Sequence, residues 1–144
     1  MSTASAPPRR LDLPAALPGV AAVQALVEEV CEAADVPPGR TFKLSMAVEE
    51  LLTNVVNHGA PQAGGRPVRM GATVQRTADA VIVALEDDAP AFDPFTEAAT
   101  AVLDADVEDR PIGGLGVYLV RTMVDEVSYA REDGRNVVTL TMKI

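Results

Sequence analysis

The chain is poor in cysteine and aromatic residues: its 144 residues include one cysteine, three phenylalanines, two tyrosines and no tryptophan. The single Cys31 excludes an internal disulfide and a cysteine-based metal cluster. So few aromatic rings give no basis for stacking on the bases of single-stranded nucleic acid. No apolar run approaches the ~20 residues that span a bilayer, and Asp12 and Pro14 fall where a signal peptide carries its apolar stretch. We therefore expect a cytoplasmic protein that does not enter a membrane.

Basic residues are also few, since 12 Lys and Arg stand against 21 Asp and Glu and give a net charge of −9. Because contacts to phosphates need clustered Lys and Arg, we expect no direct binding to nucleic acid. The negative charge suits a basic protein partner, and it suits simple solubility equally well. With 48% hydrophobic residues, a chain of this length can bury the core of one domain.

The spacing of apolar residues predicts three helices and five strands. Helices are predicted at 17–34, 42–58 and 115–124, and strands at 10–13, 68–74, 80–85, 127–131 and 137–144. Thr41 would be the N-cap of the second helix, and Gly59 would end it. Asp133-Gly134 is a strong hairpin signal between the last two strands.

The order of these elements predicts an α+β fold rather than a doubly wound nucleotide fold, and no Walker sequence is present. Consecutive hairpins indicate a mixed, mostly antiparallel sheet with the helices packed on one face. We expect residues 1–9 to be a disordered tail and residues 10–144 to form a single domain. A connection as long as residues 88–112, with three prolines, is typically a functional lid or a disordered loop.

Three glycines, Gly113, Gly114 and Gly116, stand at the start of the third helical segment. The start of a helix exposes unpaired N–H groups and the positive end of the helix dipole, which together can hold phosphate. Glycine also lets the backbone come close to a ligand. On its own, the same pattern fits a plain turn or cap.

The second predicted helix carries a polar series, Glu50, Asn54 and His58, at steps of four residues. Asn54 falls at the boundary of the apolar face, where an amide without a partner would cost about 1–3 kcal/mol. A metal ion or ligand there would satisfy it. Glu50 lies one turn away, ~6 Å along the axis, close enough to orient or deprotonate a nearby group. The alternative is an ordinary amphipathic helix with a solvated Glu50 and Asn54 bonded to backbone.

The predicted strand at 80–85 is followed by Glu86, Asp87 and Asp88. A carboxylate at the end of a buried strand can accept a hydrogen bond from an exocyclic amine such as that of adenine. It can equally cap a turn.

Taken together, the three segments resemble the N, G1 and G2 boxes of the GHKL ATPases, in particular those of RsbW-like anti-sigma factor serine kinases. The N box is Ala-Val-Glu-Glu-Leu-Leu-Thr-Asn-Val-Val-Asn-His-Gly at 47–59, and the G1 box is Asp-Asp-Ala-Pro-Ala-Phe-Asp-Pro at 87–94. The G2 box, with the helix and strand that follow it, is Gly-Gly-Leu-Gly-Val-Tyr-Leu-Val-Arg-Thr-Met-Val-Asp-Glu-Val-Ser-Tyr at 113–129. The resemblance covers roughly residues 10–144.

This resemblance implies a two-layer α/β sandwich of Bergerat type that binds ATP and Mg²⁺. Asn54 would be the Mg²⁺ ligand, Glu50 the activating carboxylate and Asp87 the contact to the adenine amine. The nucleotide-binding residues would be Asn54, Asp87, Ala89, Gly113, Gly114, Leu115 and Gly116. Phosphoryl transfer needs positioning and charge neutralisation more than a covalent catalyst. One Asn is enough because Mg²⁺ takes few protein ligands and the phosphates supply others.

The sequence departs from the family pattern at Ala89, where the G1 box has glycine. If the backbone there needs φ > 0, alanine costs about 1 kcal/mol. If glycine serves close approach to adenine, the methyl group weakens binding. We expect slightly weaker nucleotide binding and an intact site.

By resemblance, the expected function is that of an ATP-binding anti-sigma factor that phosphorylates a small anti-anti-sigma (STAS-domain) protein on serine or threonine. The expected partners are a sigma factor, the STAS protein and a second copy in a homodimer. A nucleotide-gated binding protein without catalysis is the alternative. A third reading is a detached ATPase domain that works with a separate phospho-acceptor protein.

Overall fold

The computed structural model describes residues 6–98 and 114–144, and for 97–98 and 114–118 the backbone alone. Its helices are α1 (Leu17–Ala33), α2 (Pro38–Asn54) and α4 (Gly114–Met123), with shorter helical turns η1 (Val55–Gly59), η2 (Ala60–Ala63) and η3 (Pro94–Ala98). Its strands are β1 (Arg9–Pro14), β2 (Arg69–Arg76), β3 (Ala80–Asp87), β4 (Glu126–Glu132) and β5 (Arg135–Lys143). Every predicted helix and strand is therefore found, and most boundaries move by one or two residues.

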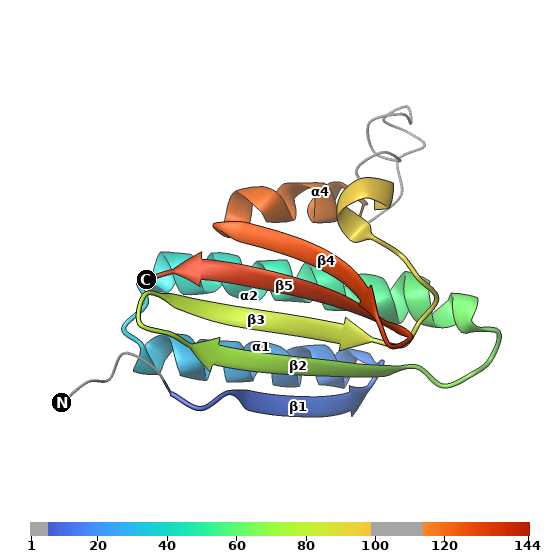
Figure 1. Cartoon of the computed structure of the whole chain (residues 1–144), viewed down its shortest axis with the longest axis horizontal. Helices are drawn as coiled ribbons and strands as arrows, with labels where there is room; N and C mark the ends of the chain where they lie inside the picture. Colours follow the sequence, from blue (N-terminus) through green and yellow to red (C-terminus); the bar gives the residue numbers. More distant parts are fainter. Residues whose placement is uncertain (1–5, 99–113) are drawn as a thin grey trace.

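The strands form one sheet in the order β1-β2-β3-β5-β4. Figure 1 shows α1 and α2 lying together behind this sheet, and the residues that the structure describes leave its other face uncovered. The predicted α+β fold is confirmed, but the expectation of a mixed sheet is wrong, because all four pairings between the described strands are antiparallel. The strand β4 runs in the same direction as β3. The hairpin then reverses the chain, so β5, which lies between them, is antiparallel to both.

The core lies between the sheet and the two long helices. Alternate residues of β3, namely Val81, Val83 and Leu85, are buried on the helix side of the sheet. Of the apolar face predicted for the second helix, Leu44, Val48, Leu51 and Leu52 of α2 are buried, and Val55, which follows α2 in η1, is partly buried. The buried side chains of β3, which alternate along the strand, and those of α2, which recur at helical spacing, belong to one hydrophobic cluster.

Both ends of α2 differ from the prediction. The helix begins at Pro38, so Thr41 lies within its first turns and is not the N-cap. Proline suits this first position because its fixed φ is already helical and its missing N–H would have no partner there. At the other end, the regular helix stops at Asn54 and continues as the π-helical turn η1 up to Gly59. Such turns are rare in proteins, and those that do occur are often found at functional sites.

The β4–β5 turn is confirmed as a tight hairpin. Asp133 and Gly134 both have positive φ, 51° and 76°. This combination matches the two-residue turn whose twist fits the flanking strands.

β1 forms one edge of the sheet, begins at Arg9 and carries charged side chains. Arg9 Nη1 lies 2.8 Å from Glu29 Oε1 on α1, and Arg10 Nη2 lies 2.8 Å from Asp12 Oδ1. Pro14 ends the strand. Among residues 6–98 and 114–144, no helix combines the length and apolar character of a membrane span.

Candidate functional site

Four segments meet at one end of the molecule: the end of α2 with η1, the end of β3, the β4–β5 turn, and the start of α4 beside η3 (Figure 1). The predicted N box and G1 box are in contact there. A Cβ atom built on Gly59 would lie 3.3 Å from the Cβ of Ala89. The sheet thus brings together segments that are about thirty residues apart in the chain.

Asp87 is the last residue of β3, and its carboxyl group is buried on the helix side with 9% of the residue exposed. Its Oδ1 accepts hydrogen bonds from the backbone N–H of Ala89 (3.1 Å) and from Nδ2 of Asn136 (2.9 Å). No described residue donates to Oδ2. Burial raises the pKa of this carboxyl group above its ordinary value, and the two hydrogen bonds partly oppose that rise.

Asn136 is the functional candidate that the sequence analysis missed. It pairs directly with Asp87 across β3 and β5, and only 5% of it is exposed. The signal was present in the sequence, because Asn136 is in phase with the buried Val138, Leu140 and Met142 of the same strand. A polar residue in a row of core positions needs hydrogen-bond partners, and here all of those partners except Tyr129 belong to the G1 box.

Ala89 is 2% exposed, and its methyl group points towards Gly59. Positive φ among the described non-glycine residues occurs only at Asp35 and Asp133, so Ala89 is not strained in the way that a required glycine would suggest. Its carbonyl oxygen accepts a hydrogen bond from Arg131 Nη1 at 2.9 Å. The first of the two penalties considered for this substitution therefore does not apply.

We predict that Ala89→Gly lowers the free energy of unfolding by about 1–2 kcal/mol, because it removes a buried methyl group and loosens the unfolded chain. ATP affinity should not improve. Gly59 has a helical φ of −69°, so the nearest obstacle to an alanine there is the methyl group of Ala89. Gly59→Ala should thus be more favourable in the Ala89→Gly background than in the parent. Urea unfolding of the four proteins tests this, and additive effects would contradict the contact.

Glu50 and Asn54 lie on the last turns of α2, and both are half-buried. Within the described part of the chain, neither side chain makes a hydrogen bond. The pKa of Glu50 is raised, first by burial and then by the neighbouring charge of Glu49, while His58 acts in the opposite direction. A carboxyl group with a raised pKa is better matched to proton transfer near neutral pH.

The predicted phosphate segment is only partly within the described residues. Gly114, Leu115 and Gly116 are the first residues of α4, as expected for a glycine-rich helix start. Gly113 lies outside the described residues. The unpaired N–H groups of such a helix start face away from the helix body towards an anion, where one is bound.

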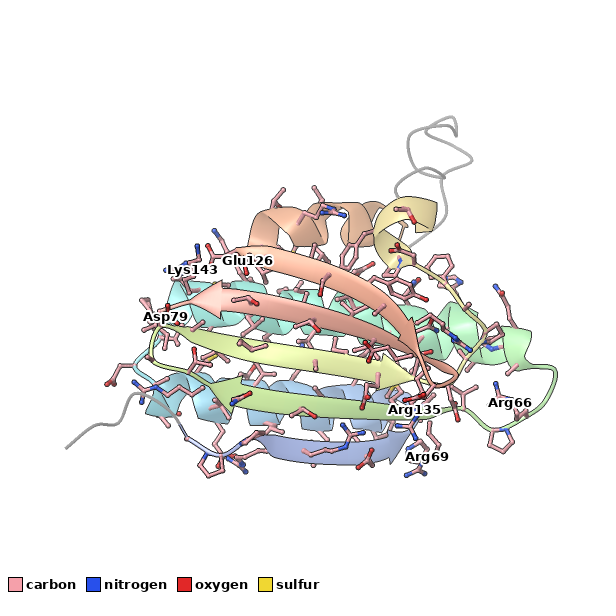
Figure 2. The ribbon with its side chains drawn as sticks, in the orientation of Figure 1. Arg66, Arg69, Asp79, Glu126, Arg135 and Lys143 are labelled. Atoms are coloured by element: carbon pink, nitrogen blue, oxygen red, sulfur yellow. The ribbon has the colours of Figure 1, made fainter. Side chains whose placement is uncertain are left out.

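The uncovered face of the sheet carries a separate polar cluster at the same end. Arg10 lies flat across the strands, with Nη1 2.6 Å from Glu86 Oε2 and 3.0 Å from Thr73 Oγ1. Gly71 makes room for it, since a Cβ there would lie 2.6 Å from Arg10 Nη2. A cavity of about 90 Å³ lies beside this cluster, and Arg69 and Arg135 are among the residues that line it. Figure 2 shows both arginines at the same end of the sheet. Because side chains alternate along β3, Glu86 and this cluster face away from the side chain of Asp87.

The family comparison agrees with this geometry. The chain belongs to the histidine kinase-like ATPase domain family, whose family model matches residues 13–142. The serine/threonine-protein kinase BtrW of Bordetella bronchiseptica is 34% identical over 100 residues, which cover 69% of this chain and 68% of that protein. The serine-protein kinase RsbW of Bacillus subtilis is 35% identical over 108 residues, which cover 69% of this chain and 61% of that protein. The RsbW protein of Halalkalibacterium halodurans is 29% identical, with 63% and 56% covered.

Solved structures share the fold. The RsbU and RsbW domains of Rv1364c from Mycobacterium tuberculosis match with a TM-score of 0.62 and 17% identity, over 95% of this chain and 32% of that one. The SiaB–SiaC complex from Pseudomonas aeruginosa matches with a TM-score of 0.53 and 13% identity, over 94% and 89%. The family match and the named relatives confirm the resemblance to RsbW-like serine kinases.

Proposed function

We propose that this chain is an ATP-dependent serine/threonine protein kinase of the RsbW type, which phosphorylates a small anti-anti-sigma protein with a STAS domain. One observation carries the proposal. At the position of the family's adenine contact, Asp87 has one carboxyl oxygen held by two hydrogen bonds and the other without a donor in the described residues. A sigma factor as a second partner and a homodimer follow from the resemblance and remain predictions.

The residues fit ATP with Mg²⁺. Oδ2 of Asp87 is an acceptor without a donor in the described residues and suits the adenine amine, and the amide of Asn54 makes no hydrogen bond in the described part of the chain. An amide oxygen is a suitable hard ligand for Mg²⁺, which keeps few protein ligands. The helix start at Gly114–Gly116 would face the phosphates. When bound, Mg²⁺ would neutralise phosphate charge.

Glu50 would act on the acceptor. In the transfer, an oxygen of a serine or threonine hydroxyl group bonds to the terminal phosphorus of ATP, the bond to the bridging oxygen breaks, and ADP leaves. The proton of the hydroxyl group would pass to the carboxylate of Glu50. Glu50 lies one turn before Asn54, on the same helix, so the base and the ion would be held by one rigid element.

The pH dependence of the transfer should report Glu50. Since its pKa is raised above the ordinary 4.5, the acidic limb of the rate profile is expected above pH 4.5. Glu49→Gln removes a neighbouring negative charge and should move the limb to lower pH. His58→Gln removes a stabilising charge and should move it to higher pH. Initial rates measured across pH 4–8 test this, and shifts in the same direction for both variants would contradict the assignment.

The direct test is transfer of label from radiolabelled ATP to a purified cognate STAS-domain protein, in the presence of Mg²⁺. Acid-stable label on serine or threonine supports the proposal. ATP binding without any transfer would favour the alternative of a nucleotide-gated binding protein. Acid-labile label on a separate acceptor would favour a detached ATPase domain with a histidine acceptor.

A further inference from the structure

Asn136 ties the G1 box to the last hairpin. Its Nδ2 donates to Asp87 Oδ1 (2.9 Å) and to the carbonyl oxygen of Pro90 (3.1 Å). Its Oδ1 accepts from the N–H of Phe92 (3.1 Å) and from the hydroxyl group of Tyr129 (2.6 Å). An amide side chain offers two donors and two acceptor positions, and here all four are used within the protein. Asn136 therefore has no bond left for a ligand and acts through its neighbours.

The most important of these neighbours is Asp87. Because Asn136 and the N–H of Ala89 both bind Oδ1, the carboxyl group is held in one orientation, with Oδ2 as its remaining acceptor. The bond from Asn136 also lowers the pKa of Asp87, against the effect of burial. Asn136 thus does two things to this carboxyl group: it fixes the direction of the group, and it favours the ionised form, which can only accept hydrogen bonds.

We propose that Asn136 is a positioning residue that sets base selectivity, favouring a purine with a 6-amino group over one with a 6-oxo group. The inference rests on the proposed function, in which Asp87 receives the adenine amine. An ionised, oriented carboxylate accepts a bond from the amine but meets the oxygen of a 6-oxo purine as a second acceptor. If Asn136 is removed, the carboxyl group can turn or take up a proton, and a protonated group can donate to that oxygen.

Tyr129 holds Asn136 from the far side. Tyr129 lies on β4, and its hydroxyl group donates to the amide oxygen of Asn136. Two successive hydrogen bonds therefore link it to the carboxyl group of Asp87. Tyr129→Phe keeps the ring and removes this bond, together with the interaction of the hydroxyl group with the backbone N–H of Phe92. The variant should therefore loosen the orientation of Asn136 in a folded protein, with a smaller effect in the same direction as Asn136→Ala.

The test is the ratio of affinities for ATP and ITP, which carries a 6-oxo group, measured by calorimetry with Mg²⁺. The parent should prefer ATP at least about tenfold, the value of one hydrogen bond against one repulsive contact. We expect Asn136→Ala to reduce this preference by about tenfold or more and Tyr129→Phe to reduce it by a few-fold. Gln24→Ala is the control, since it removes a polar tie between α1 and Ser45 of α2, far from the G1 box.

The possible results distinguish a failure of the role of Asn136 from a failure of the proposed function. A folded Asn136→Ala protein that keeps the parental ATP/ITP ratio overturns the inference and leaves the proposed function intact. If Asn136→Ala does not fold, an unchanged ratio in Tyr129→Phe overturns it instead. An equal loss of selectivity in Gln24→Ala would also overturn it, because general loosening would then explain the effect. A parent that binds no ATP, or binds ITP equally well, overturns the role of Asp87 and the inference with it.

Discussion

Replacing Asp87 by asparagine is expected to weaken ATP binding by about 100- to 1,000-fold, while the folded protein stays as stable as the parent or becomes more stable. The loss of affinity has two parts. A hydrogen bond to a charged acceptor disappears, and the new amide N–H group faces the adenine amine as a second donor. Together these are worth about 3–4 kcal/mol.

The fold should tolerate this change because the hydrogen bonds of Asp87 all use Oδ1. Asparagine keeps an oxygen there for the N–H of Ala89 and the amide of Asn136. It also removes a buried charge.

The sign of the stability effect follows from the direction of the pKa shift. The pKa of Asp87 is raised in the folded protein above the ordinary 3.8. Its ionised form is therefore disfavoured by folding, and the parent loses stability as pH rises from about 3.8 through the folded pKa. Asp87→Asn escapes this loss, so its advantage in Tm should be absent below pH 3.8 and should grow as the pH rises from 3.8 through the folded pKa.

Calorimetry with ATP and thermal unfolding at several pH values check both halves of this prediction. Asp88→Asn is the matched control, because Asp88 Oδ1 accepts only from the N–H of Arg69 at the sheet end and lies 3.6 Å from Arg66. It should bind ATP like the parent. Equal losses in both variants would mean that negative charge in general, and not the carboxyl group of Asp87, attracts the ligand.

Glu50→Gln should reduce phosphotransfer by about 100- to 10,000-fold, the range that a general base contributes. ATP affinity should be unchanged or slightly higher, because the amide has the same shape and one negative charge near the phosphates is gone. The variant thus separates chemistry from binding.

Glu49→Gln controls for charge on the same helix. It removes the adjacent carboxylate, which belongs to the polar tie with Gln24, and it should transfer phosphate at the parental rate on the pH plateau. Single-turnover rates with saturating ATP distinguish the two variants. Transfer that survives in Glu50→Gln would remove Glu50 from the mechanism and leave positioning alone as the source of catalysis.

The local signals in the sequence were sufficient to predict most elements. The helical period of α2 identified Leu44, Val48, Leu51 and Leu52 as core, and Asp133-Gly134 identified the hairpin, because both patterns report chain geometry within one element. They also placed Asp87 at the end of its strand. The three predicted segments come together at one end of the sheet, as far as the described residues extend.

What the sequence did not predict depends on contacts between distant elements. Asn136 lies 49 residues from Asp87, and only the strand register brings them together. The π-helical turn after Asn54 has no simple sequence pattern, and neither does the pairing of Ala89 with Gly59. The N-cap at Thr41 was wrong because Pro38, a good first residue of a helix, competes with a threonine three positions later.

The charged edge strand β1 limits how two copies of this chain can associate. An exposed strand edge invites another chain to continue the sheet, and charged side chains and proline discourage this. β1 presents Arg9, Arg10, Asp12 and Pro14, with the arginines already engaged by Glu29, Asp12 and Glu86. Adding a foreign strand there would break ion pairs and meet a residue without an N–H group. The homodimer expected from the resemblance should therefore not extend the sheet across β1, and β1 should also protect this edge of the sheet against strand-mediated aggregation.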